Sequence, residues 1–159
     1  MKRLSAGEAT RPYWRVSHDG RLSRQEGMTT TYDATAVLAR FATARQVLLT
    51  TFRRDGTPVG TPVHIAVDGP RAFVRTFSPS GKLTRLRREP RAQIAPCTLG
   101  GKVRGEPLGV SVRFLPAGQE YDRAGRLIGD RHPLLHRRLI PWLHRRTGRT
   151  TIHLELTPA

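Results

Sequence analysis

The chain has 159 residues, the length of one domain with its own hydrophobic core, and it carries a net charge of +16. No stretch approaches the ~18 consecutive apolar residues of a membrane-spanning helix. No apolar run of the kind found in secretory signals follows Lys2 and Arg3, and the single cysteine, Cys97, excludes a disulfide framework within one chain. We therefore expect a cytoplasmic protein without a membrane anchor.

The positive charge has three competing explanations. Of the 28 basic residues, all but Lys2, Lys82 and Lys102 are arginine, while the acidic residues number only 12. Nucleic acid is the usual partner of such a chain, and a small polyanionic ligand is the second explanation. The third is a genome rich in G and C, which accounts for the excess of Arg over Lys but not for the scarcity of acidic residues. The basic residues form no single run of the kind found in nucleic-acid-binding tails.

The first 27 residues differ from the rest of the chain, because they lack hydrophobic periodicity. Met28 opens a segment in which Asp33 is a good N-cap for a short helix with Leu38 and Phe41 on one side. The sequence therefore predicts a flexible leader over residues 1–27 and one folded domain over residues 28–159, with Met28 as a candidate start.

Three strands and two tight turns follow. Alternating apolar residues predict strands at Gln46–Arg54, Pro58–Val67 and Arg71–Phe77. Asp-Gly pairs at residues 55–56 and 68–69 are typical of hairpin turns. Pro62 lies within the second strand, and because proline has no N–H to donate, it indicates a sheet edge or a bulge there.

A short loop, Ser78-Pro79-Ser80-Gly81-Lys82, joins the third strand to a basic helix over Gly81–Glu89. Free backbone N–H groups, hydroxyls and one ammonium converge in such a loop, so it suits an anion, above all a phosphate. Arg85 lies three residues after Lys82 on the same helix face, so both cations can reach one phosphate group. The competing interpretation is a solvated basic face, which we expect for Arg87 and Arg88.

The remaining elements complete a small barrel. Strands are predicted at Arg91–Cys97, Gly109–Leu115 and Thr150–Leu156, and helices at Gln119–Gly129 and Pro133–Arg146. Six strands with helices set aside at one end favour a mainly β fold of α+β type, a six-stranded antiparallel barrel with short flanking helices.

Two passages of the chain resemble a known superfamily. They run from Leu49 to Val63 and from Ser80 to Arg91, and the second is similar to the signature Ser-x-Lys-x-x-x-Leu-x-x-x-Pro. Together they resemble the FMN-binding split barrels of the pyridoxamine-phosphate-oxidase-like superfamily. The pattern is most similar to the actinobacterial branch that uses the deazaflavin coenzyme F-420.

The resemblance implies a homodimer with the cofactor in a groove between the subunits. It implies that the cofactor phosphate lies near the loop and helix at Ser80, Gly81 and Lys82, and that the ring lies along the strand around Pro62. The cofactor-binding residues that it suggests, together with the helix-face argument for Arg85, are Thr61, Pro62, Val63, Arg75, Thr76, Ser80, Gly81, Lys82 and Arg85.

Other candidate sites carry weaker signals. His132 and His136 are four residues apart, but Pro133 intervenes and no carboxylate has matching spacing, so we expect no metal site. Cys97 ends an apolar strand and is expected to be a small buried side chain. His64 is placed to contact a ligand or to pack on the sheet surface. No residue is identified as a catalytic acid, base or nucleophile.

The sequence therefore predicts an oxidoreductase that transfers a hydride from reduced coenzyme F-420 to a small organic acceptor. The alternatives are an FMN-binding oxidoreductase of the same fold, a cofactor carrier without turnover, and a basic nucleic-acid-binding barrel. The last is disfavoured, because stacking on bases needs exposed aromatic residues on strands, whereas Phe52, Phe73, Phe77 and Phe114 are explained as core.

Overall fold

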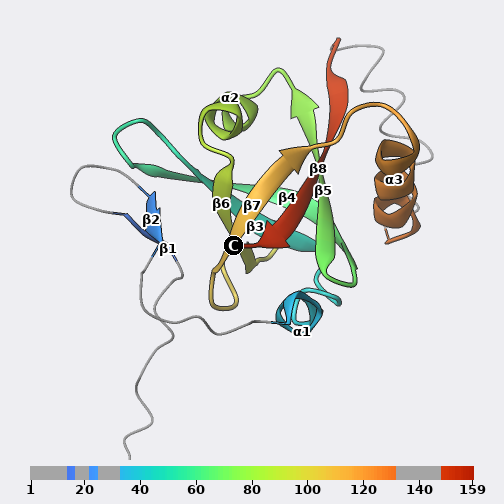
Figure 1. Cartoon of the computed structure of the whole chain (residues 1–159), viewed down its shortest axis with the longest axis horizontal. Coiled ribbons are helices and arrows are strands. Elements are labelled where there is room, and N and C mark those ends of the chain that lie inside the picture. The colour runs from blue at the N-terminus through green and yellow to red at the C-terminus, as the bar shows by residue number, and fades with distance from the viewer. Residues whose placement is uncertain (1–13, 17–21, 25–32, 132–147) are drawn as a thin grey trace, which may run out of the picture.

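The structure, a computed structural model, describes residues 14–16, 22–24, 33–131 and 148–159 (Figure 1). Its main body is a closed antiparallel barrel with the strand order β3-β4-β5-β8-β7-β6. The six strands are β3 (Gln46–Phe52), β4 (Pro58–Asp68), β5 (Arg71–Ser78), β6 (Arg91–Pro96), β7 (Leu108–Phe114) and β8 (Thr150–Pro158). The predicted six-stranded barrel is thereby confirmed.

The alternation seen in the sequence separates the inside of the barrel from the outside. Alternate residues of each strand fill the interior, because successive side chains of a strand point to opposite faces. Fully buried interior residues are Val47, Leu49, Ile65, Ala72, Val74, Ile94, Val110, Leu154 and Leu156. The first predicted turn is also confirmed: Gly56 has a φ of 85°, and the backbone N–H of Thr57 donates to the Asp55 carboxylate.

Two short helices close opposite ends of the barrel (Figure 1). Helix α1 (Ala34–Ala39) begins after Asp33, whose carboxylate accepts from the N–H of Thr35 as predicted for an N-cap. Helix α2 (Gly81–Arg88) follows β5 and buries Leu83 and Leu86 in the barrel core. The position of α2 brings its basic residues to the end of the barrel where β3 ends and β4 begins.

A third helix, α3 (Gln119–Arg131), lies on the outer face of the barrel. Its buried residues Ala124 and Ile128 pack against Ala66 of β4 and Phe73 of β5, in an apolar cluster separate from the interior. The helix approaches β8 closely at Gly125, where an added Cβ would lie 3.1 Å from Cε1 of His153. A larger residue than glycine would push the helix away at this point.

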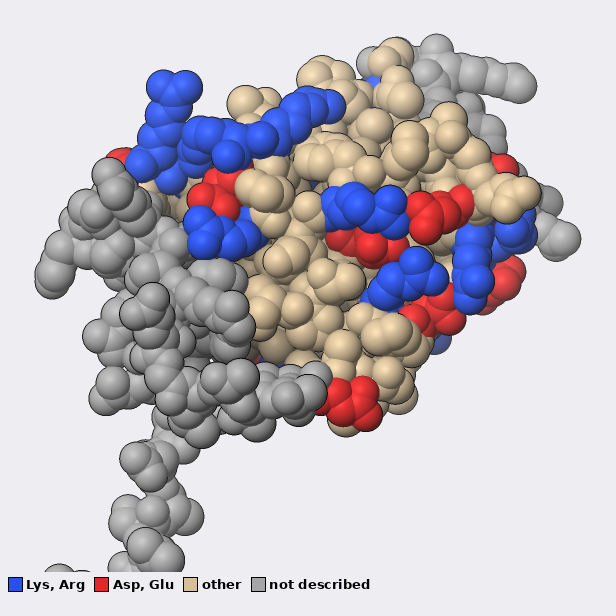
Figure 2. Space-filling model, in the orientation of Figure 1, with Lys and Arg blue, Asp and Glu red and all other residues tan. Residues whose placement is uncertain are grey.

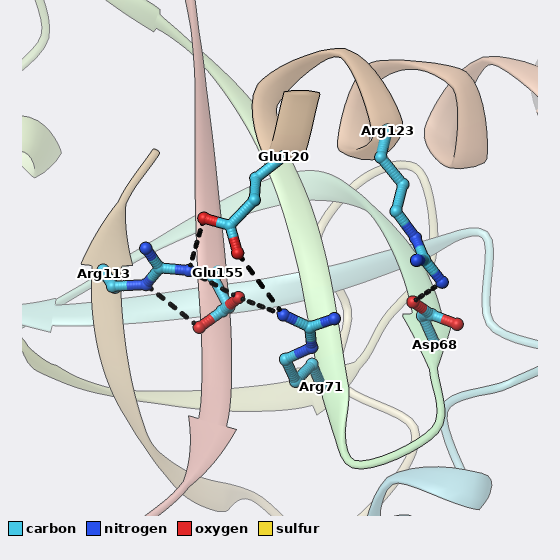
Figure 3. Close-up of polar contacts among 6 residues, drawn as sticks. All are labelled: Asp68, Arg71, Arg113, Glu120, Arg123 and Glu155. Carbon is cyan, nitrogen blue, oxygen red and sulfur yellow. Dashed lines mark hydrogen bonds and ion pairs between the residues drawn. The ribbon is translucent and has the colours of Figure 1, made fainter. Parts of the chain in front are cut away.

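Charged residues join α3 to the barrel and link β7 to β5 and β8 (Figure 3). The buried Glu155 of β8 accepts from Arg113 of β7 and from Arg71 of β5, at 2.9 and 3.2 Å. Glu120, in the first turn of α3, joins both arginines, at 3.0 Å from Arg113 and 3.7 Å from Arg71. Hydrogen bonding from Arg113 holds the pKa of Glu155 below its usual range.

The barrel opens between β4 and β5. These strands pair only from His64 with Arg75 down to Asp68 with Arg71 at the hairpin. Beyond His64 and Arg75, residues 58–63 of β4 pair with β3 alone, and residues 76–78 of β5 pair with β8 alone. We call the parting of the two strands at His64 and Arg75 the fork. Pro62 lies on this unpaired stretch of β4, as expected for a proline within a strand.

Two features lie outside the barrel. A short antiparallel pair, β1 (Trp14–Val16) and β2 (Leu22–Arg24), falls within the segment expected to be a leader, where no strand is predicted. The predicted helix over residues 133–146 lies outside the described residues.

We expect Glu155→Gln to lower the free energy of unfolding by roughly 1.5–3 kcal/mol at pH 7, because it removes a charged acceptor from two arginines. The folded-state pKa of Glu155 is lowered, so its contribution is present above the ordinary carboxyl pKa of about 4.3 and is lost as pH falls through the folded-state pKa. Urea unfolding of both proteins between pH 7 and pH 3 should therefore show the difference shrinking.

The matched control is Asp68→Asn, which removes the more exposed ion pair between Asp68 and Arg123. We expect it to change the free energy of unfolding by about 0–1 kcal/mol. Equal losses in the two variants would contradict a special role for Glu155.

Candidate functional site

The fork brings several of the predicted site residues together. Val63 of β4 and Thr76 of β5 are the first residues beyond the last paired residues, His64 and Arg75. From there, one side of the opening is formed by Pro62 and Thr61, and the other by the end of β5. The loop that follows β5 leads to the N-terminus of α2 at Ser80, so an opening between two strands ends at a helix N-terminus.

Two hydroxyl groups at this place have no partner within the described part of the chain. The Thr76 Oγ1 and Ser80 Oγ atoms are buried, and neither forms a hydrogen bond there. Ser80 occupies the N-cap position of α2, yet its side chain does not cap the helix. Buried hydroxyls are normally hydrogen-bonded. The Thr76 hydroxyl near the end of β5 and the Ser80 hydroxyl at the start of α2 therefore indicate the place of a polar ligand.

Lys82 lies half-buried in the first turn of α2. Burial lowers the pKa of its ammonium, and the nearby Arg85 and Arg149 lower it further. Burial also lowers the pKa of Arg85, with repulsion from Arg53 and Arg88 as the next causes. Each of these shifts reports a cation whose charge is disfavoured by its surroundings.

Five cations lie in or near α2. The set, here called the α2 cation cluster, consists of Arg53, Lys82, Arg85, Arg88 and Arg149. None of the ion pairs found between described residues involves any of them. Figure 2 shows a band of Lys and Arg side chains at the upper left, over the part of the molecule where Figure 1 draws α2.

The arginines of the α2 cation cluster also have structural contacts. Arg85 Nε donates to Thr51 Oγ1 at 2.8 Å, and Arg88 Nη2 donates to the Phe52 carbonyl at 2.7 Å. Both bonds join α2 to the end of β3, beyond the stretch that pairs with β6. Arg88 is therefore not the purely solvated residue expected from the sequence, whereas the exposed Arg87 lies over the Phe114 ring.

The residues present suit a phosphate. A helix N-terminus with free N–H groups, two unpartnered hydroxyls and a half-buried ammonium offer several donors to one anion. A dianion would also offset the mutual repulsion of Lys82, Arg85 and Arg149. Ser80, Gly81 and Lys82 are consecutive residues at the start of α2, and their binding of a cofactor stays a prediction.

Arg75 and Thr76 lie on opposite faces of β5, because they are consecutive residues of a strand. Thr76 points toward the barrel interior, and Arg75 lies on the outer face, beneath α3. There Arg75 Nε donates to His153 Nε2 at 3.3 Å, and Nη2 donates to the Gly125 carbonyl at 3.4 Å. One ligand bound between Thr76 and Lys82 would therefore meet the backbone of residue 75 rather than its guanidinium.

Arg75 belongs to a row of polar side chains on the outer face of the barrel that the sequence does not predict. Gln46, His64, Arg75 and His153 follow one another across β3, β4, β5 and β8, each opposite the next. Gln46 Nε2 lies 3.2 Å from His64 Nε2. The strand register that creates this row depends on the closure of the barrel, which no local pattern reveals. Only the sheet-surface interpretation of His64 anticipates part of it.

The described residues give less support to a metal site or a reactive cysteine. No group of three or more metal-ligating side chains occurs among the described residues, and His132, His136 and His144 lie outside them. Burial raises the pKa of the Cys97 thiol, which disfavours its thiolate. No helix in the described part of the chain is long and apolar enough to span a membrane.

Solved structures share this fold. A provisionally named pyridoxamine 5′-phosphate oxidase from Listeria innocua matches with a TM-score of 0.56 at 13% identity, over 79% of this chain and 92% of its own. HutZ, the heme storage protein from Vibrio cholerae, matches with a TM-score of 0.57 at 12% identity, over 80% of this chain and 92% of its own.

A conserved protein of unassigned function from Mycobacterium tuberculosis matches with a TM-score of 0.54 at 20% identity, over 85% of this chain and 84% of its own. No protein-family model and no curated protein matches the chain. At these identities the likeness shows the fold alone, and the chain has the fold of the pyridoxamine-phosphate-oxidase-like split barrels.

We expect inorganic phosphate to stabilise the protein more than chloride does at equal ionic strength, because it fills an anion site at α2. A phosphate concentration a hundred times the dissociation constant should add about 2.7 kcal/mol to the free energy of unfolding. Thermal unfolding should show this gain in the wild type and in Arg87→Ala but not in Lys82→Ala. Equal stabilisation of all three proteins would indicate nonspecific salt binding.

Proposed function

We propose that this chain is a split-barrel oxidoreductase that reduces a small organic acceptor with a hydride from the deazaflavin coenzyme F-420. The observation that carries the proposal is the α2 cation cluster beside the hydroxyls of Thr76 and Ser80, which have no partner among the described residues. A buried phosphate with further negative charge outside it would suit such a site. A cofactor with one phosphate and a tail of several carboxylates offers both.

The chain's own residues would bind and orient the cofactor. Ser80, Thr76 and Lys82 would hold the phosphate, while Arg53 and Arg149 would lie nearer its outer charges. The unpaired backbone of β4 around Pro62 offers polar groups to the edge of a planar ring, because β5 does not use them. Reduced deazaflavin supplies the hydride when it is bound.

FMN is the second candidate, since its single phosphate would fit the same donors of Ser80, Thr76 and Lys82. A carrier without turnover is the third, and the likeness to the Vibrio cholerae heme storage protein keeps this fold class in view. Salt dependence separates the first two candidates, because binding that uses more ion pairs weakens more as salt rises. Turnover with an acceptor separates enzyme from carrier.

The decisive measurement is the absorption spectrum of the protein purified from a host that makes both cofactors. We expect a deazaflavin spectrum, and a flavin spectrum would favour the second candidate. Protein that carries neither cofactor and binds neither in titrations would contradict both, and would favour a nucleic-acid or nonspecific polyanion partner.

Titrations then test the site residue by residue. Lys82→Ala removes a charge-assisted contact of about 1.5–3 kcal/mol, so the dissociation constant should rise roughly tenfold to a hundredfold. Arg87→Ala is the matched control and should leave affinity unchanged, whereas Arg88→Ala is unsuitable because Arg88 is bonded to Phe52. Raising the salt concentration should weaken deazaflavin binding more than FMN binding. Equal losses in both variants would indicate a diffuse basic surface.

We also propose that the protein is a homodimer in which a second chain completes the cofactor groove. One barrel of this size leaves the fork open on its outer side, and a cofactor with a long tail would remain exposed to water there. Light scattering should give the mass of a dimer at micromolar concentration. A monomer that still binds cofactor with unchanged affinity would overturn this proposal.

A further inference from the structure

Arg75 is the most deeply buried cation in the described part of the chain. Only 6% of its surface is exposed. Among the buried residues described, the only carboxylate is Glu155, and it is held by Arg71 and Arg113 rather than by Arg75. Charged side chains are rarely buried to this extent without a partner of opposite charge.

The contacts of Arg75 leave its charge uncompensated. Its guanidinium has five N–H donors. Nε–H donates to the His153 imidazole, one hydrogen of Nη2 donates to the Gly125 carbonyl, and no further acceptor is found among the described residues. Both acceptors are neutral groups. Burial accordingly lowers the pKa of Arg75, since desolvation of the cation outweighs the other influences.

The acceptors also fix the guanidinium in place. His153 Nδ1 lies 3.1 Å from the Tyr121 carbonyl, so this nitrogen carries the hydrogen and Nε2 is left to accept from Arg75. The Tyr121 ring packs on the imidazole with centroids 4.2 Å apart. A guanidinium held from one side by a helix and a neighbouring strand is pre-organised, which lowers the entropy lost when a ligand binds it.

The position of Arg75 connects it with the cofactor site. Arg75 and His64 are the last paired residues before β4 and β5 separate, and the next residues, Thr76 and Val63, flank the opening. In the same row, Gln46 contributes a buried carbonyl oxygen, Oε1, that has no donor among the described residues. The closed end of the fork therefore has guanidinium donors on β5 without an acceptor among the described residues, and the acceptor of Gln46 lies on β3, on the far side of His64.

We propose that the acceptor reduced by this protein carries a carboxylate, and that Arg75 is the residue that binds it. A carboxylate suits the planar fork of a guanidinium, because two parallel N–H donors meet its two oxygens. The cofactor phosphate has its own donors around α2, so the two anions occupy separate places along β5. This inference rests on the proposed function for the identity of the ligand as a substrate.

The test uses benzoate as the probe and benzamide as its neutral counterpart, each titrated into the full chain at constant ionic strength. The readout is the NMR signal of the Arg75 Nε–H, assigned in the wild-type protein through its through-bond correlations to the Arg75 side chain and backbone. We expect a saturable shift with benzoate and none with benzamide. The Nε–H of Arg113, which is bonded to Glu155, is the internal control and should not move.

Variants sharpen the result. Arg75→Lys keeps the charge but loses the fork, so benzoate affinity measured by calorimetry should fall roughly tenfold to a hundredfold. Arg71→Lys is the same change on the same strand, at a residue already paired with Glu155, and should leave affinity unchanged. If Arg75→Lys does not fold, the wild-type titration with its internal control still decides the matter.

The inference is overturned if benzoate leaves the Arg75 signal unmoved, if benzamide moves it equally, or if inorganic phosphate binds there more tightly than benzoate. Failure of the proposed function looks different. Protein that binds neither FMN nor deazaflavin but binds benzoate at Arg75 keeps the carboxylate site and loses the cofactor. Protein that binds a cofactor but not benzoate loses only the carboxylate site.

Discussion

The parting of β4 from β5 is the constraint on which the rest of the site depends. If β4 and β5 paired along their whole length, the backbone groups of both strands would be satisfied and none would be left for a ligand. Pro62 has no N–H to give, so it suits a stretch of β4 that pairs on one side only. Once β5 turns away beyond Arg75, its continuation through Ser80 brings α2 to the end of the opening, and the basic residues of α2 arrive with it.

The two ends of the opening use charge in different ways. At α2, cations repel one another, and the buried hydroxyls of Thr76 and Ser80 have no hydrogen-bond partner among the described residues. At the fork, a single guanidinium is isolated from water between β5 and α3. The carboxylates that might have neutralised these groups are used elsewhere: Glu155 and Glu120 tie Arg71 and Arg113 across β5, β7, β8 and α3 (Figure 3). Some of the excess basic residues therefore form ion pairs that support the fold, and others lie at the candidate site.

Much of the fold could be predicted from the sequence, because alternation along strands and the Asp55-Gly56 turn are local signals. The candidate anion loop could also be located from the sequence, since Ser80, Gly81 and Lys82 are neighbours in the chain. The burial of Arg75 was not, because it depends on α3 crossing the outer face at Gly125. The bond from Arg88 to the Phe52 carbonyl was equally hidden, since it requires the end of β3 to lie beside α2.

The unpaired stretch of β4 has a consequence for solubility. Exposed strand edges template pairing with other chains, and barrels normally escape this hazard by having no edge. Here residues 58–63 present an edge toward the fork, on which Pro62 interrupts the row of donors and Gly60 weakens the preference for extended pairing. Pro62 and Gly60 therefore discourage a foreign strand from pairing with this edge, so an edge left open for a ligand need not be a place where chains aggregate.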